Sequence, residues 1–102
     1  MSMSELIVKR IRWDEFNIAH IAERHGITLQ QVEEACYGDS TLIKVEETYK
    51  NHLLLLAPRG NGQLLAVVLV PEGEGVYYPV TARPTKRQER RRYASWRAER
   101  ET

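Results

Sequence analysis

The sequence predicts an α+β fold in which two N-terminal helices and a C-terminal basic helix pack against a mostly antiparallel sheet of three or four strands. Helix-start signals occur near both ends of the chain, whereas the middle consists of short apolar runs separated by turns. Such turns join antiparallel neighbours, because parallel pairing needs a long crossover. A chain of 102 residues has room for one core, so we expect residues 1–102 to form a single domain.

The first predicted element is a strand over residues 6–12, where apolar and basic residues alternate. A helix should follow, because Asp14 is a good N-cap and Gly26 can end the helix in the left-handed conformation. We expect His20 to lie inside the protein within this helix. The apolar stripe of the helix comprises Phe16, Ala19, Ile21 and Ala22.

A second helix is predicted directly after the first one. Thr28 and Gln31 match a capping box at its start, and Gly38 can close it. Cys36 lies on the apolar face of this helix, which indicates a buried structural thiol rather than a nucleophile. As the one cysteine of the chain it has no intrachain partner, so a reducing compartment such as the cytoplasm is expected.

The middle of the chain predicts the sheet. Asn61 and Gly62 form the strongest hairpin signal of the sequence, and the solid apolar run after them indicates a buried central strand. The predicted strands cover residues 42–48, 53–57, 63–70 and 76–82.

The last predicted element is a helix that opens with Thr85 and Gln88 as a capping box and runs to about Glu99. Its apolar contacts should come from Tyr93, Ala94 and Trp96. The segment is basic: residues 83–102 contain 8 Lys/Arg and 3 Asp/Glu, against 7 and 11 in residues 1–82. This asymmetry indicates contact with a polyanion or an acidic protein, although a solvated helix face has the same pattern.

Several classes of function are excluded by missing patterns. The chain has no phosphate-binding loop, and one cysteine with three histidines provides no zinc spacing, so we expect neither a metal nor another cofactor. No apolar run is long enough to span a membrane, and no signal peptide is recognisable. We therefore expect a soluble, cytoplasmic protein.

The remaining polar residue types suit metal-independent RNA cleavage, in which the ribose 2′-hydroxyl attacks the phosphate and the protein supplies cations and proton transfer. Arg83, between the last strand and the final helix, is the best candidate for the phosphate cation, and Arg59 in the hairpin turn is a second. His52 and Tyr78 are candidates for proton transfer. Each of these residues also has an ordinary alternative as a surface or core side chain.

A second group of basic residues is suited to hold the RNA backbone. On the predicted final helix these residues form two basic ridges, because residues four apart share a face. Docking of an acidic protein partner is an equally good interpretation of the same ridges. The candidates for RNA binding are Lys50, Lys86, Arg87, Arg90 and Arg91.

Three segments, taken together and in this order, resemble the BrnT family, the toxins of bacterial type II toxin–antitoxin systems. The resemblance spans about residues 11–93, and its most specific part runs from Ala82 to Tyr93. The segments are Trp13-Asp14-Glu15 with Asn17, His25-Gly26-Ile27-Thr28, and the stretch from Val80 to Arg90 followed by Tyr93.

The resemblance implies a fold similar to the RelE-like ribonuclease toxins and RNA cleavage without a metal. It also implies a ribbon-helix-helix (BrnA-like) antitoxin as partner in a 2:2 assembly. A sheet edge and apolar helix faces can equally bury a second copy of the chain, so a homodimer is the alternative. Arg83 carries over directly as the arginine after the last strand. Relatives have arginines near the positions of His52 and Tyr78, so this chain departs from the family pattern there.

Two functions follow from these observations. One is an endoribonuclease toxin that uses Arg83, and the other is a non-catalytic protein that keeps the toxin fold and binds RNA or an antitoxin. The environment of Arg83 separates them. If its guanidinium is turned from any groove and locked to a neighbouring carboxylate, the nuclease interpretation fails and only the scaffold is left.

Overall fold

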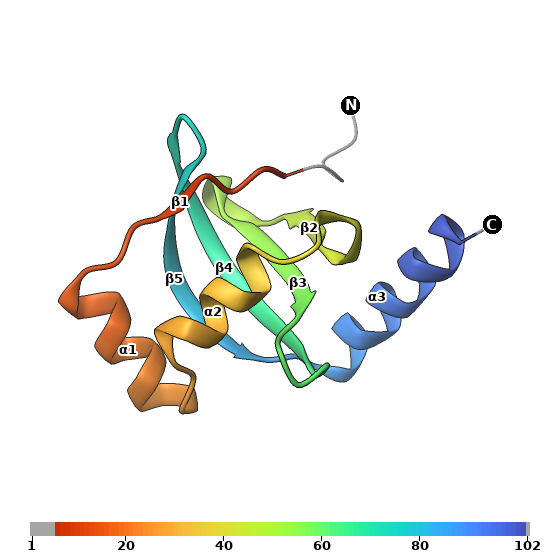
Figure 1. Ribbon diagram of the computed structural model, residues 1–102, viewed down its shortest axis with the longest axis horizontal. Helices are drawn as coiled ribbons and strands as arrows, with labels where there is room; N and C mark the ends of the chain where they lie inside the picture. The colour runs from red at the N-terminus through yellow and green to blue at the C-terminus, as the bar shows by residue number, and fades with distance from the viewer. Residues whose placement is uncertain (1–5, 102) are drawn as a thin grey trace.

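A five-stranded sheet with helices on both faces forms the part of the protein, residues 6–101, that the computed structural model describes (Figure 1). The strand order is β1-β5-β4-β3-β2. The strands are β1 (Arg10–Ile11), β2 (Lys44–Glu47), β3 (Leu53–Pro58), β4 (Leu64–Gly73) and β5 (Val76–Pro84). The helices are α1 (Glu15–His25), α2 (Leu29–Cys36) and α3 (Arg87–Arg100).

The predicted α+β class and the central position of β4 are confirmed, but the sheet has five strands rather than three or four. The strand predicted over residues 6–12 is shorter, β1, and it joins the sheet as the fifth strand: Arg10 and Ile11 pair with Val76 and Tyr77 of β5. This pairing is parallel, whereas all other strand pairs are antiparallel. It is possible because most of the chain lies between β1 and β5 and serves as the crossover.

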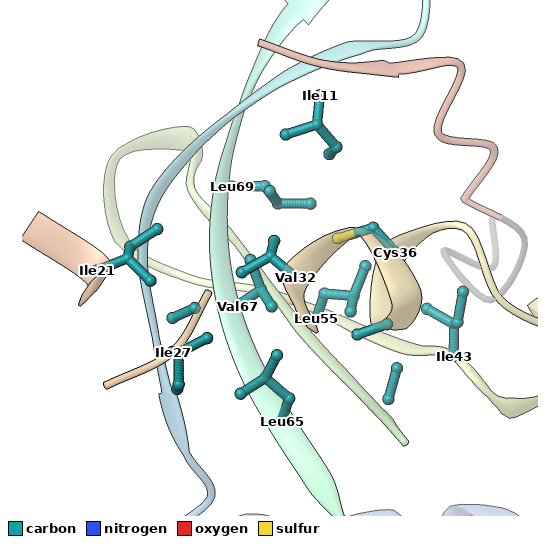
Figure 2. Close-up of a cluster of buried hydrophobic side chains, with 13 residues drawn as sticks. Ile11, Ile21, Ile27, Val32, Cys36, Ile43, Leu55, Leu65, Val67 and Leu69 are labelled. Atoms are coloured by element: carbon teal, nitrogen blue, oxygen red, sulfur yellow. The ribbon is translucent and has the colours of Figure 1, made fainter. Parts of the chain in front are cut away.

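The apolar runs of β3 and β4 are continuous because both faces of these strands are buried. Leu55 and Val67 belong to a cluster beneath α2, which Figure 2 shows, whereas Leu54 and Leu56 belong to a second cluster with Tyr93 of α3. Helices therefore cover both faces of the central strands. The first cluster comprises Ile11, Ile21, Ile27, Val32, Ala35, Cys36, Ile43, Leu55, Ala57, Leu65, Val67, Leu69 and Ala82.

The predicted starts of the first two helices are confirmed. Asp14 is the N-cap of α1 and accepts a hydrogen bond from the backbone N–H of Asn17, while Thr28 and Gln31 form the capping box of α2. Gly26 ends α1 with a φ of 65°. Gly38 does not close α2 by a left-handed turn. It is required because a Cβ there would lie 2.9 Å from the carbonyl oxygen of Glu34.

The predicted apolar stripe of α1 is largely wrong. Ile21 is buried, but the Phe16 side chain is 74% exposed, and Ala19, Ala22 and His20 are exposed as well. The reason is the place of α1, which lies beside β5 at the margin of the sheet and contacts it with one narrow side (Figure 1). Tertiary position therefore overrides the amphipathic pattern.

The final helix begins later than predicted, at Arg87 with Lys86 as its N-cap. Thr85 and Gln88 do not form the capping box. Instead, the carboxylate of Glu89 accepts a 2.8 Å hydrogen bond from the backbone N–H of Lys86 and so fixes the start. The inner face of α3 is formed by Tyr93 and Trp96, whereas Ala94 is exposed, contrary to prediction.

Two further features bear on the chemistry that the chain can perform. Cys36 is buried, as predicted, and burial raises the pKa of its thiol to about 12. Within residues 6–101, no three His, Cys, Asp or Glu side chains come together in a way that could bind a metal ion. The helices of this part of the chain are also too short or too polar to cross a membrane.

Candidate functional site

The predicted catalytic residues lie at two opposite ends of the sheet. Arg59 follows β3, and Arg83 is close to the end of β5, so both are at the end that we call the Arg83 end. His52 precedes β3, and Tyr78 pairs with Val70 near the other end, which we call the His52 end. The six residues of β3 separate these ends by about 20 Å at roughly 3.3 Å per residue. The two pairs therefore do not meet at one phosphate.

Arg83 is engaged in a bidentate ion pair. Its Nη1 donates to Oε1 of Glu89 and its Nη2 donates to Oε2 of Glu89, both at 2.8 Å. The side chains are 21% and 6% exposed, respectively. The hydrogen bond to Glu89 raises the pKa of Arg83, and the same bond lowers the pKa of Glu89.

The structure therefore shows the ordinary alternative for Arg83, a pair with a nearby glutamate, rather than a guanidinium left open for a phosphate. Glu89 is nearly buried, and a buried carboxylate needs a partner that balances its charge and satisfies its oxygens. Moreover, the cavity next to this pair is lined by Pro84 and Thr85 rather than by Arg83. Sequence reasoning missed Glu89. Its signal was an acidic residue at the N3 position of a helix that is otherwise rich in arginine.

Tyr78 is likewise held by neighbours. Its hydroxyl donates to Oδ2 of Asp14 at 3.0 Å, and the guanidinium of Arg12 lies 4.5 Å from the centre of its ring. Arg12 is itself bound to Glu72 at 2.6 and 2.7 Å. Burial and the hydrogen bond to Asp14 raise the pKa of Tyr78, so the phenol keeps its proton at neutral pH.

His52 lies on the wall of a separate cavity of about 420 Å³, together with Glu47, Asn51 and Tyr77. Tyr78 is not part of this wall, so the two candidates for proton transfer are not brought together. Lys50 lies in the adjoining turn, where its ammonium is 5.3 Å from the centre of the Tyr49 ring. This end of the sheet therefore carries a histidine and one predicted RNA-binding lysine.

Arg59 and Arg90 are brought together at the Arg83 end. Both line a cavity of about 360 Å³ between the β3–β4 turn and the start of α3, to which Thr85 also contributes. Arg59 Nη2 donates to Oε1 of Gln63 at 2.8 Å, and Arg90 Nη1 donates to the carbonyl oxygen of Thr85. Within residues 6–101 neither guanidinium forms an ion pair.

The other predicted RNA-binding residues of α3 are exposed. Lys86 and Arg87 stand at the start of the helix, beside the same end of the sheet. Arg91 lines a further cavity of about 390 Å³ with Arg92 and Trp96, but Arg92 is bound to Glu46 at 2.8 Å. The unpaired positive charge of α3 is thus greatest toward its first turns.

The fold is similar to that of a known toxin. The crystal structure of the ribonuclease toxin BrnT of Brucella abortus matches this chain with a TM-score of 0.62 and 20% sequence identity. The match covers 76% of this chain and 97% of that chain. No protein-family model and no curated protein matches the sequence. The BrnT-like fold that the sequence predicted is confirmed.

Proposed function

We propose that this chain is the toxin of a type II toxin–antitoxin pair and that it cleaves RNA. The observation that carries the proposal is the fold, which is shared over 97% of the length of a ribonuclease toxin. The segments of the sequence that resemble the BrnT family support the same function. The gathering of unpaired arginines at one end of the sheet adds a surface suited to RNA.

The proposed reaction is attack of the ribose 2′-hydroxyl on the adjacent phosphate, which needs no protein nucleophile and no metal. The cation that stabilises the phosphorane is not Arg83, because that guanidinium is bound to Glu89. The nuclease interpretation in the form that the sequence predicted, with Arg83 as the phosphate cation, therefore fails. The proposal of cleavage now rests on the fold and on the other cations at the same end, Arg59, Arg90, Lys86 and Arg87.

The proposed partner is a ribbon-helix-helix antitoxin that forms a 2:2 assembly with the toxin. The alternative assembly is a homodimer of the toxin. An antitoxin must cover a surface that the toxin leaves open. Apart from the basic face of α3, the side chains of Phe16 and Val80 border an open cavity of about 420 Å³ between α1 and β5. Exposed apolar side chains of this kind are typical of protein–protein contact sites.

A second function is favoured by a specific observation. The predicted catalytic residues are divided between two ends about 20 Å apart, and the best of them is held in an ion pair. A protein that keeps the toxin scaffold and binds RNA or an antitoxin without cleavage is consistent with this arrangement. The proposed location of the protein is the cytoplasm, where cellular RNA is found.

Induced expression in bacteria distinguishes the two functions. A ribonuclease toxin should arrest growth and fragment the RNA extracted from the cells, and co-expression of its ribbon-helix-helix antitoxin should restore growth. Normal growth with intact RNA, while the soluble chain accumulates, would favour the non-catalytic function.

A further inference from the structure

We propose that the cavity lined by Arg59, Thr85 and Arg90, hereafter the Arg59–Arg90 cavity, binds a phosphodiester group of an RNA strand. The inference deepens the proposed function and rests on RNA as the substrate. The sequence predicted that Arg83 binds the phosphate. The proposed phosphate site is instead a cavity of about 360 Å³ next to that residue.

The wall that carries Arg59 is held in place by its own backbone. The N–H of Arg59 donates to the carbonyl oxygen of Gln63 at 2.9 Å, and the carbonyl oxygen of Arg59 accepts from Gly62 at 2.7 Å. The N–H of Gly60 donates to Oε2 of Glu34 on α2 at 2.8 Å. The turn is thus tied both to itself and to a helix, so little ordering is needed when a ligand binds.

The opposite wall is held by the start of α3. The guanidinium of Arg90 is directed by its hydrogen bond to the carbonyl oxygen of Thr85, the residue that joins β5 to the helix. The Glu89–Arg83 pair fixes the position of this junction. Two arginines that are 31 residues apart in the sequence therefore line one cavity, because two separate hydrogen-bond networks hold the turn and the helix that carry them.

One donor of a residue that lines the cavity has no acceptor. Nε of Arg59 is buried from solvent and has no hydrogen-bond partner. A buried N–H without a partner costs free energy, and an anionic oxygen that reaches it from the cavity would remove this cost. This atom is the second indication, besides the two guanidiniums, that the cavity is built to receive an anion.

The positive charge of the arginines at the cavity is also not balanced by a carboxylate of the described residues. Arg83, Arg92 and Arg97 are each bound to a glutamate of the chain. Among the described residues, Arg59 and Arg90 have no such partner. The exposed Lys86 and Arg87 and the positive end of the α3 dipole add to the local potential.

A phosphodiester fits this donor set better than a carboxylate. Arg59 lines the cavity from the β3–β4 turn, and Thr85 and Arg90 line it from the start of α3, so donors belong to two separate parts of the chain. Such donors match the tetrahedral oxygens of a phosphate, whereas the two oxygens of a carboxylate lie in one plane with a single fork. The basic first turns of α3 then provide further contacts for the neighbouring phosphates of a strand.

The binding test uses a fluorescent 2′-O-methyl RNA oligonucleotide, which cannot be cleaved by 2′-hydroxyl attack. Fluorescence anisotropy gives its Kd for the wild type, Arg59→Gln, Arg90→Gln and the control Arg24→Gln, an exposed residue of α1. Each cavity variant should bind about tenfold more weakly and lower the salt slope by about one, whereas the control should change less than about twofold. Cavity variants that bind like the control would overturn the proposal.

A second measurement follows the Nε–H signal of Arg59 by NMR spectroscopy, with RNA, polyglutamate and inorganic phosphate as separate probes. A shift that saturates with RNA at the concentration of its Kd supports the proposal. A stronger response to polyglutamate, or a response to inorganic phosphate alone, would overturn it in favour of an acidic protein or free phosphate. If the wild type cleaves RNA but the cavity variants bind RNA normally, the proposed phosphate site is wrong and the proposed function stands. If the cavity variants bind RNA more weakly but the wild type cleaves no RNA, the phosphate site is supported and the proposed nuclease function is wrong.

Discussion

At the scale of single residues, Glu89 organises the junction between β5 and α3. Its carboxylate accepts two hydrogen bonds from Arg83 and one from the backbone N–H of Lys86, while its side chain is only 6% exposed. The same carboxylate thus satisfies the start of the helix and balances the arginine at the end of the strand.

The substitution Glu89→Ala should lower the free energy of unfolding by about 2–4 kcal/mol, because it leaves a largely buried guanidinium without its partner. Urea denaturation measures the loss. The matched control is Arg92→Ala, which breaks the more exposed pair with Glu46 and should cost less than about 1 kcal/mol. Equal losses in the two variants would contradict the special role of Glu89.

The stability that Glu89 contributes should depend on pH. Its pKa is lowered in the folded state below the ordinary value of 4.5, chiefly by the hydrogen bond from Arg83. The contribution is therefore complete above about pH 4.5 and is lost as the pH falls through the folded pKa. The difference in unfolding free energy between the wild type and Glu89→Gln should be large at pH 7 and smaller at pH 3. A difference that does not change with pH would exclude this explanation.

At the scale of elements, the turn between β2 and β3 carries local strain. Lys50 has a φ of 59° and Asn51 a φ of 62°, and the N–H of His52 donates to the carbonyl oxygen of Tyr49 at 3.3 Å. Two left-handed central residues define a type I′ turn, which matches the twist of the strands but favours Asn and Gly. Lysine is a poor residue at the first of these positions.

The substitution Lys50→Asn should therefore raise the free energy of unfolding by about 0.5–1 kcal/mol, because asparagine tolerates the left-handed conformation. Thermal unfolding followed by circular dichroism measures the gain. Lys50→Ala removes the same charge but keeps the strain, so it should give no increase. A gain of similar size in both variants would show that charge, rather than backbone strain, is responsible.

Local signals predicted the helices well where the partner residues are close in sequence. Helix caps act within one turn of the chain, so the sequence predicts the roles of Asp14, Thr28 and the helix-ending Gly26. The start of α3 was misjudged because Glu89 is committed to Arg83 as well as to the helix. The apolar stripe of α1 was misjudged because the contact of this helix with β5 depends on the whole fold.

At the scale of the whole molecule, the register of β3, β4 and β5 decides which residues meet. It separates His52 and Tyr78 from Arg59 and Arg83 by the length of a strand, although all four were candidates for one site. The same register brings the turn after β3 beside the start of α3, so that Arg59 and Arg90 line one cavity. No local pattern predicts this grouping, because the two residues are far apart in the sequence. The type of residue at the site was therefore predictable, whereas its grouping was not.

The most direct test of the account is the cleavage of an end-labelled RNA by the purified chain in EDTA. The account predicts fragments that end in a 2′,3′-cyclic phosphate, formed at least about tenfold more slowly by the double variant Arg59→Gln/Arg90→Gln, a loss of about 1.4 kcal/mol in transition-state stabilisation. Full-length RNA after long incubation with chain that circular dichroism shows to be folded would contradict it.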